Sequence, residues 1–179
     1  HKRNGTGEKV LEKLKMIMNR AGVTTNLSPA RSAALLKEET TGAPAGAMVL
    51  PDGRVVTGKT GNLLGSASAL LMNALKGVSG VDDELYVISD DVLEPICHLK
   101  TEHLKSKNPR LHSDETLLAL SISSVTNPIA ERLIDNVDKL RGCDAYFSVI
   151  TSTDEKLYRT LGINVCCEPK YEQHRYYHK

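Results

Sequence analysis

Glycine, lysine and threonine in the stretch "VLPDGRVVTGKT", residues 49–60, have the spacing of a phosphate-binding loop. Gly53 is followed, after four residues, by Gly58, Lys59 and Thr60. In loops of this kind the backbone N–H groups surround the phosphates of a nucleotide, while the lysine and the hydroxyl residue open the next helix. The local sequence decides whether the pattern carries that function.

The residues around Gly53 favour a β-hairpin instead. Asp52-Gly53 joins the apolar runs "AMVL" and "RVV", and a two-residue Asp-Gly link between such runs is the strongest short-range hairpin signal. The two valines of "RVV" would otherwise occupy the phosphate cradle, where β-branched residues resist the positive φ that glycine adopts freely. We therefore expect antiparallel strands over about 45–50 and 54–59, with Gly53 and Lys59 at opposite ends of the second strand.

The stretch "TGKTGN" at the end of the hairpin is the first candidate binding site. It combines a cation, hydroxyl groups and an amide, and its backbone N–H groups lie near the positive end of the helix that follows. Such a segment can hold a phosphate or carboxylate without being a nucleotide loop. The alternative is a solvated strand end in which the asparagine caps the helix. The candidate ligand-binding residues here are Thr57, Gly58, Lys59, Thr60 and Asn62.

The second candidate is "LKTEHLKSKNPRLHSDE", a locally basic stretch. Asn108-Pro109 favours a turn, so we expect an anion-binding loop or lid here. Lys107, Asn108 and Arg110 join the candidate ligand-binding residues. His112 is the candidate catalytic residue, as a general acid or base, because the intrinsic pKa of histidine lies near neutrality. The alternative is a solvated surface loop that precedes a helix.

A third stretch, "SISSVTNP", places several hydroxyl groups in an otherwise apolar helix. These groups either line a cleft or bond back to the preceding helical turn. A Ser-His-Asp arrangement cannot be read from the sequence alone, so no pattern supports nucleophilic catalysis by these serines. The residues are Ser121, Ser123, Ser124, Thr126 and Asn127.

The composition describes one domain with balanced charge. The chain has 179 residues, 40% of them hydrophobic, and a formal net charge of +1. No overall field recruits nucleic acid or an anionic membrane, and no apolar run is long enough to cross one, so we expect a cytoplasmic protein. The cysteines lack the paired short spacings of zinc sites, so we expect no metal at Cys97, Cys143, Cys166 and Cys167.

Helices and strands alternate as in an α/β fold. After two helices and the hairpin, periodicity and caps predict helices over 63–76, 90–104, 113–127, 129–140 and 153–162, and strands over 84–89, 144–150 and 163–167. We expect a three-layer sandwich around a five-stranded mixed sheet, in which the hairpin forms an edge and the later strands form a parallel β-α-β-α-β run. The expected organisation is a helical lead-in or linker over 1–44, the sandwich domain over 45–172, and a tail over 173–179.

Several long stretches resemble one known bacterial family. They include "LPDGRVVTGKTGNLLGSASALLMNALKGVSGVDDELYVIS", "LKTEHLKSKNPRLHSDETLLALSISSVTNP", "LRGCDAYFSVI" and "LGINVCCEPKYE". Together they resemble, over about residues 28–172, the C-terminal part of the domain of unknown function 1846, also called uncharacterised protein family 0371. Members are much longer, so the resemblance implies a C-terminal domain whose partner is its own N-terminal half. That half carries a glycine-rich, phosphate-loop-like stretch, and some members have been labelled ATP-dependent peptidases.

The expected strand order is also similar to that of the cytidine-deaminase fold. Zinc deaminases carry a His- or Cys-Ala-Glu motif after the hairpin and Pro-Cys-x-x-Cys at the next helix. Here Ser66-Ala67-Ser68 stands at the first position, and "EPICHLK" contains one cysteine, Cys97, at the second. The resemblance is therefore to the topology without the zinc motifs, and it implies no zinc-dependent deamination.

Two functions stay open from the sequence. The first is binding, with or without catalysis, of a small anionic or phosphorylated ligand at the two polar loops. The second is a non-catalytic module for self-association, since helix 63–76 is apolar on nearly all sides and no firm catalytic set is present. In the second case the chain is expected to form a homo-oligomer and to position the N-terminal half.

Overall fold

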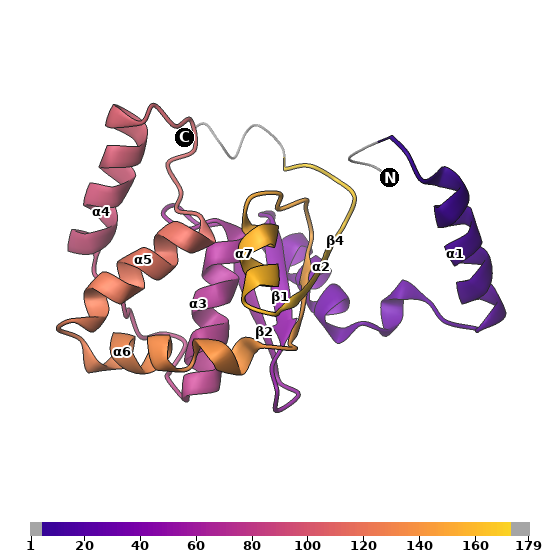
Figure 1. Cartoon of the computed structure of the whole chain (residues 1–179), viewed down its shortest axis with the longest axis horizontal. Coiled ribbons are helices and arrows are strands. Elements are labelled where there is room, and N and C mark those ends of the chain that lie inside the picture. Colours follow the sequence, from indigo (N-terminus) through magenta and orange to yellow (C-terminus); the bar gives the residue numbers. More distant parts are fainter. Residues whose placement is uncertain (1–4, 173–179) are drawn as a thin grey trace.

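The Asp52-Gly53 turn closes a β-hairpin in the computed structural model, which describes residues 5–172 (Figure 1). Strand β1 (Ala45–Val49) pairs antiparallel with β2 (Val55–Lys59). Gly53 adopts φ 84°, which only glycine reaches without strain, and its N–H donates to the carbonyl of Leu50 at 2.9 Å. The prediction of a hairpin is confirmed, but its turn consists of Pro51, Asp52 and Gly53 rather than two residues, since the Leu50 N–H still donates to the Arg54 carbonyl at 2.8 Å.

Two further strands complete one mixed sheet with the order β2-β1-β3-β4. Strand β3 (Asp144–Phe147) pairs antiparallel with β1, and β4 (Asn164–Cys167) pairs parallel with β3. Helix α7 (Asp154–Thr160) connects β3 to β4, as parallel strands require a crossover. The α/β class and the mixed sheet are as predicted from the sequence.

The predicted fifth strand, over residues 84–89, is wrong: the sheet of the described chain has four strands. Val87 and Ile88 are buried, but Tyr86 is 92% exposed, and the Val87 carbonyl accepts a hydrogen bond from the Asn127 side chain at 3.1 Å. The sequence pattern of a short apolar run does not distinguish a buried strand from a buried irregular segment. Without this strand only one β-α-β unit forms, and the order expected from the cytidine-deaminase fold is not found.

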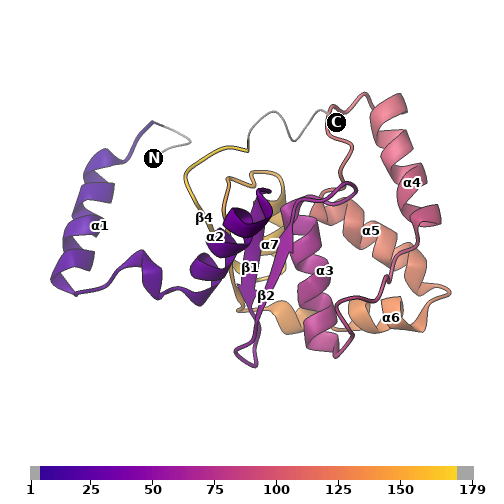
Figure 2. The ribbon, with the colours of Figure 1, turned by 180° about the vertical axis from the view of Figure 1, so that it is seen from behind.

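The helices cover both faces of the sheet (Figures 1 and 2). Helix α2 packs on one face, where Ala45 and Ala47 are fully buried, and α3 packs on the other. Beyond α3 lie α5 and α6, with α4 at the edge of the molecule (Figure 1). The bounds are α1 Glu8–Arg20, η1 Thr25–Leu27, α2 Pro29–Thr41, α3 Ser66–Ser79, α4 Asp90–His98, η2 Leu99–His103, α5 Ser113–Ser124, α6 Pro128–Asp135 and η3 Val137–Leu140.

Caps fix α2 as its sequence predicts. The Ser28 side chain accepts the N–H of Arg31 at 3.3 Å, Pro29 occupies the first turn, and Gly42 ends the helix at φ 66°. Its buried Ala30 and Ala34 lie against the sheet, so this part of the expected lead-in contributes to the core.

Helix α3 is the central helix of the core. It begins at Ser66 rather than near Asn62 and ends before Gly80, so both predicted ends are displaced toward the C-terminus. Its apolar residues are buried between the sheet and the outer helices, which explains why the helix is apolar on nearly all sides. They are Ala67, Leu70, Leu71, Met72, Ala74 and Leu75. The helix therefore presents no exposed apolar stripe for self-association.

Gly58 of β2 allows α3 to approach the sheet. A Cβ at this position would meet Leu70 N and lie 2.5 Å from Leu70 Cα. Real side-chain atoms do not come so close to backbone, so only glycine fits here. The glycine that completes the phosphate-loop pattern is thus required by helix packing.

No helix within the described chain is long and apolar enough to cross a membrane.

Candidate functional site

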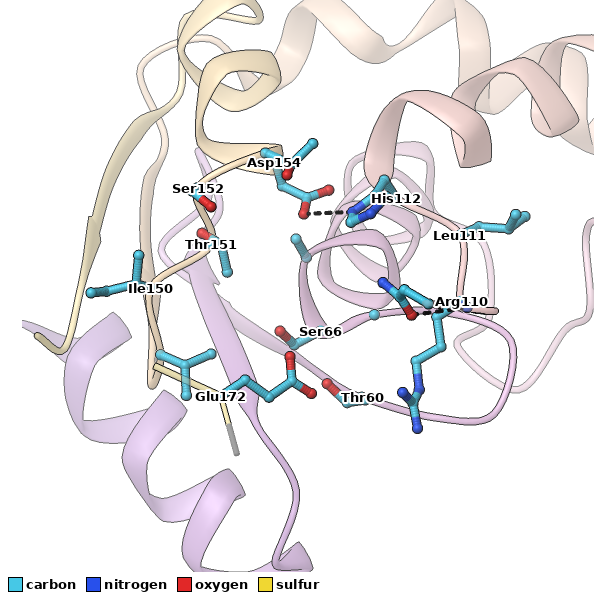
Figure 3. Close-up of a pocket in the computed structure, with 15 residues that line it drawn as sticks. Thr60, Ser66, Arg110, Leu111, His112, Ile150, Thr151, Ser152, Asp154 and Glu172 are labelled. Atoms are coloured by element: carbon cyan, nitrogen blue, oxygen red, sulfur yellow. Dashed lines mark hydrogen bonds and ion pairs between the residues drawn. The ribbon is translucent and has the colours of Figure 1, made fainter. Parts of the chain in front are cut away.

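A polar cavity of about 90 Å³ lies where α3, α5 and α7 begin (Figure 3). His112 and Asp154 lie on one side of it, and Thr60, Ser66 and Glu172 lie on the other. Further walls come from the loop before α5, which contributes Asn108 and Arg110, and from residues 149–153 after β3. The cavity has room for a few waters or one small polar group, whereas sites for whole metabolites measure about 300 to 1,000 Å³.

His112 and Asp154 form an ion pair across the two helix starts. The imidazole Nδ1 lies 3.3 Å from the Asp154 Oδ2 atom, and the other carboxylate oxygen accepts the backbone N–H of Ser113 at 2.7 Å. Asp154 is thus held by the start of α5 although it belongs to α7. Both side chains are largely shielded, with exposed fractions of 32% for His112 and 12% for Asp154.

The pair shifts both ionisation equilibria toward the charged forms. The hydrogen bond to Asp154 raises the pKa of His112 and outweighs burial, which lowers it. Burial acts to raise the pKa of Asp154, but its hydrogen bonds to His112 and to the start of α5 outweigh burial and lower that pKa. The arrangement therefore favours an imidazolium beside a carboxylate.

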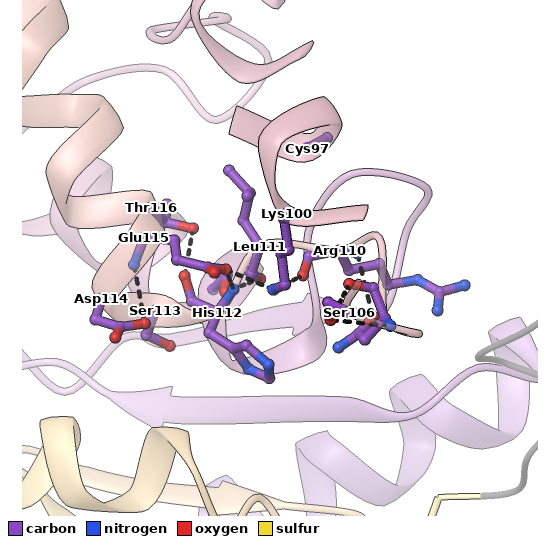
Figure 4. Close-up of polar contacts among 12 residues, drawn as sticks. Cys97, Lys100, Ser106, Arg110, Leu111, His112, Ser113, Asp114, Glu115 and Thr116 are labelled. Carbon is purple, nitrogen blue, oxygen red and sulfur yellow. Dashed lines mark hydrogen bonds and ion pairs between the residues drawn. The ribbon is translucent and has the colours of Figure 1, made fainter. Parts of the chain in front are cut away.

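Lys100 fixes the loop that carries His112 (Figure 4). Its buried ammonium donates to the carbonyl of Arg110 at 2.6 Å and to the Oε2 atom of Glu115 at 2.6 Å. The same carboxylate oxygen accepts the backbone N–H of His112 at 2.7 Å. Lys100 lies in η2, a π-helical turn, and such turns are frequent at functional sites. The backbone of the loop before α5 is therefore held from inside the protein.

The start of α3 supplies backbone donors to the opposite wall. Within residues 5–172, no acceptor is found for the N–H groups of Ser66 and Ala67, and no side chain caps the helix. Groups of this kind favour an anion because of their partial positive charge and the helix dipole. The hydroxyl of Ser113 is also fully buried and has no partner among the described residues.

The structure brings together four of the predicted site residues. Thr60, Asn108, Arg110 and His112 all line the cavity. The Arg110 guanidinium also donates from Nε to the carbonyl of Gly61 at 2.6 Å, which joins the two predicted loops.

The remaining predicted residues lie elsewhere. Lys59 and Asn62 line a separate, more apolar groove of about 390 Å³ between α3 and residues 85–93. Successive residues of a strand point to opposite sides, so Lys59 and Thr60 diverge. Thr57, Gly58 and Lys107 line neither space.

Two of the hydroxyls of "SISSVTNP", those of Ser123 and Ser124, bond within their own helix. Ser123 donates to the Ala119 carbonyl at 2.9 Å, Ser124 donates to the Ser121 carbonyl at 2.7 Å, and Asn127 caps α6 by accepting the N–H of Ile129. The stretch back-bonds and caps, and it lines no part of the polar cavity.

Sequence reasoning missed Asp154, the partner of His112. The residue lies 42 positions further along the chain, in "TSTDEK". An acidic residue at a helix start is already explained by its favourable interaction with the helix dipole, so it indicates no site by itself. In the sequence, Ser66 stands out only as a departure from a zinc motif. Neither residue carries a local signal that links it to the basic loop.

These features define an α/β domain with an open, four-stranded mixed sheet and a small polar cavity at three converging helix starts. The chain belongs to the family described as "Domain of unknown function DUF1846, C-terminal", whose model matches residues 26–177.

Its relatives carry the family name and are much longer. A "UPF0371 protein" of Corynebacterium efficiens is 44% identical over 179 residues, which is 99% of this chain and 36% of the relative. One from Streptococcus pneumoniae is 41% identical over 174 residues, which is 97% of this chain and 35% of the relative. The resemblance to this family found in the sequence is confirmed, and the chain spans about a third of the length of the curated relatives it matches.

Proposed function

We propose that the polar cavity binds a small anion of phosphate size, either free or as the end group of a larger ligand. One observation carries the proposal: the His112 ring, paired with Asp154, faces backbone N–H groups at the start of α3 for which residues 5–172 supply no acceptor. A cationic ring and free amides on two walls are complementary to an anion between them. Arg110 adds a third donor group at the rim.

Two carboxylates in the walls limit what can bind. The charge of Asp154 is offset by His112 and the Ser113 amide, and Glu172 lines the cavity on the side of Ser66. Each wall therefore holds a carboxylate near its donors, Asp154 beside His112 and Glu172 on the side of Ser66, and the bound group must contact the donors of α3, His112 and Arg110 while it avoids both carboxylates. This requirement favours a small oxyanion, whose oxygens accept hydrogen bonds from defined directions, over a large anion.

We assign His112 the role of proton donor to the bound group. Because Asp154 raises the pKa of His112, the ring keeps its proton to a higher pH than a free histidine does, and that proton is available to a leaving oxygen if the ligand reacts. Asp154 then acts as a positioning residue that orients the ring.

Calorimetry and urea unfolding with inorganic phosphate test the proposal. Binding to the native state alone raises the free energy of unfolding by about 2.7 kcal/mol at a phosphate concentration about 100 times Kd. His112→Gln and Arg110→Gln should each weaken binding by about tenfold, a typical contribution of a charge-assisted hydrogen bond. Binding should also weaken as the pH rises through the raised pKa of His112.

Lys107→Gln is the matched control, because Lys107 is exposed in the same loop but lines no cavity. Its phosphate affinity should equal that of the parent chain. Equal losses in all three variants would show that only the net charge of the loop matters. No stabilisation at high phosphate would refute the binding site itself.

A further inference from the structure

Helix α1 carries an apolar face that the described chain leaves uncovered. Every residue from Glu8 to Arg20 is described, and none is buried. On one side of the helix the exposed fractions are 62% for Val10, 52% for Leu14 and 56% for Ile17. A helix with one apolar stripe gains its stability by burying that stripe, so an uncovered stripe indicates a missing neighbour.

The position of α1 along the chain separates it from the domain. Figures 1 and 2 show α1 standing away from the sheet, joined to α2 through η1 and a turn in which Gly22 has φ 64°. The family model for the C-terminal domain begins at residue 26, after α1. The Corynebacterium efficiens relative nevertheless aligns over 179 residues, and this chain covers only 36% of it. Helix α1 thus lies at the junction between the C-terminal domain and the rest of the longer proteins.

We infer that the apolar face of α1 packs against the polypeptide that precedes it in full-length members of the family. The stripe formed by Val10, Leu14 and Ile17 then closes the core of the preceding part, while Gly22 and η1 connect that part to the sheet domain. This inference is independent of the anion site, because α1 contributes no residue to the cavity.

Two other occupants fit the helix less well. A helix of 13 residues is only about 20 Å long, so pairing with a second copy through this stripe falls short of the roughly 800 Å² that each partner buries in a stable complex. The charged side chains of α1 are the acids Glu8 and Glu12 and the bases Lys9, Lys13, Lys15 and Arg20. The two carboxylates weaken attraction to an anionic membrane surface, which selects a basic face.

Amide hydrogen exchange, measured on this chain and on a full-length relative, tests the inference. In this chain the amides of α1 should exchange near the rate of a fraying helix, because no residue between 5 and 172 covers its apolar face. In the full-length Corynebacterium efficiens relative, the segment aligned with residues 8–20 should exchange at least 100-fold more slowly. Equally fast exchange of the two segments would overturn the inference.

Light scattering and vesicle binding of this chain distinguish the alternatives. The variant Leu14→Gln/Ile17→Gln removes the stripe, and Lys15→Gln/Asn19→Gln is its control, with two substitutions on the polar side of the same helix. The parent and both variants should be monomers of equal mass and should not sediment with phosphatidylserine vesicles. A dimer, or vesicle binding, lost only in the stripe variant would show that a second copy or a membrane covers α1, and would overturn the inference.

Discussion

Substituting Gly58 by alanine tests whether this glycine serves packing or ligand binding. The residue belongs to β2, and its Cα faces the backbone of α3. A Cβ would lie 2.5 Å from Leu70 Cα and 2.7 Å from the carbonyl carbon of Ala69. Ordinary contact between carbon atoms begins at about 3.5 Å, so the helix must retreat from the sheet by roughly 1 Å.

A retreat of this size weakens the packing of the whole α3–sheet interface. A radial gap of about 0.5–1 Å already removes a quarter to a half of the dispersion energy of each contact. Leu70 and Met48, both fully buried, lie in this part of the core. We therefore expect Gly58→Ala to lower the free energy of unfolding by about 3 kcal/mol, the upper end of the usual range for overpacking.

Urea unfolding followed by circular dichroism measures the effect. With a slope of about 2 kcal/mol/M, the midpoint should fall by roughly 1.5 M. Gly61→Ala is the control, because its Cβ would meet nothing nearer than 3.9 Å and its φ is not positive, so its midpoint should change little. If Gly58→Ala lost phosphate binding while its midpoint stayed unchanged, packing would not be the reason for the glycine.

Three further substitutions probe the site and the core beside it. Asp154 raises the folded-state pKa of His112, so their pair stabilises the fold below the unfolded pKa of His112, and this stabilisation is lost as the pH rises through the folded pKa. Asp154→Asn should therefore flatten the pH dependence of the free energy of unfolding, measured by urea unfolding at a series of pH values. An unchanged pH profile would exclude the pair as the source of the dependence. Lys100→Met should destabilise the protein by about 3 kcal/mol, because it leaves the Glu115 carboxylate without its cation, and a loss below about 0.5 kcal/mol would show that the loop is held by other contacts. Tyr158→Phe should cost about 1 kcal/mol in the same assay, because the buried hydroxyl loses a 2.7 Å bond to an α3 carbonyl, and no loss would mean that this bond contributes nothing net.

The elements that the sequence predicts well are those specified by neighbouring residues. Asp52-Gly53 fixes the hairpin, and Ser28 with Pro29 fixes the start of α2, because turn and cap geometry depend on the local backbone. The false strand at 84–89 depends on pairing with a distant segment, and its apolar residues are equally satisfied by packing without pairing. Local sequence patterns predict which apolar residues are buried, but they do not predict which groups the backbone of those residues hydrogen-bonds to.

The residues of the candidate site likewise differ in whether the local sequence predicts them. His112 and Arg110 were identified because their charge is visible in one continuous loop. Asp154 was not, since it reaches His112 only after β3 pairs with β1 and α7 packs beside α5. Lys59 was placed with Thr60 because they are neighbours in sequence, although the alternation of a strand sends them to different spaces.

The antiparallel pairing of β1 with β3 has a consequence for synthesis. The two strands are separated by about 100 residues, and Ala45 also donates to the Ser148 hydroxyl across 103 positions. The hairpin closes within microseconds of leaving the ribosome, but at about 5–20 residues per second its partner strand follows roughly 5–20 s later. During that interval the edge of β1 that later pairs with β3 has unpaired backbone N–H and C=O groups, and a strand of another chain can pair with them. Nascent chains halted between Gly80 and Gly142 should therefore be the ones that most need chaperone protection, and ribosome profiling of chaperone engagement would reveal that window.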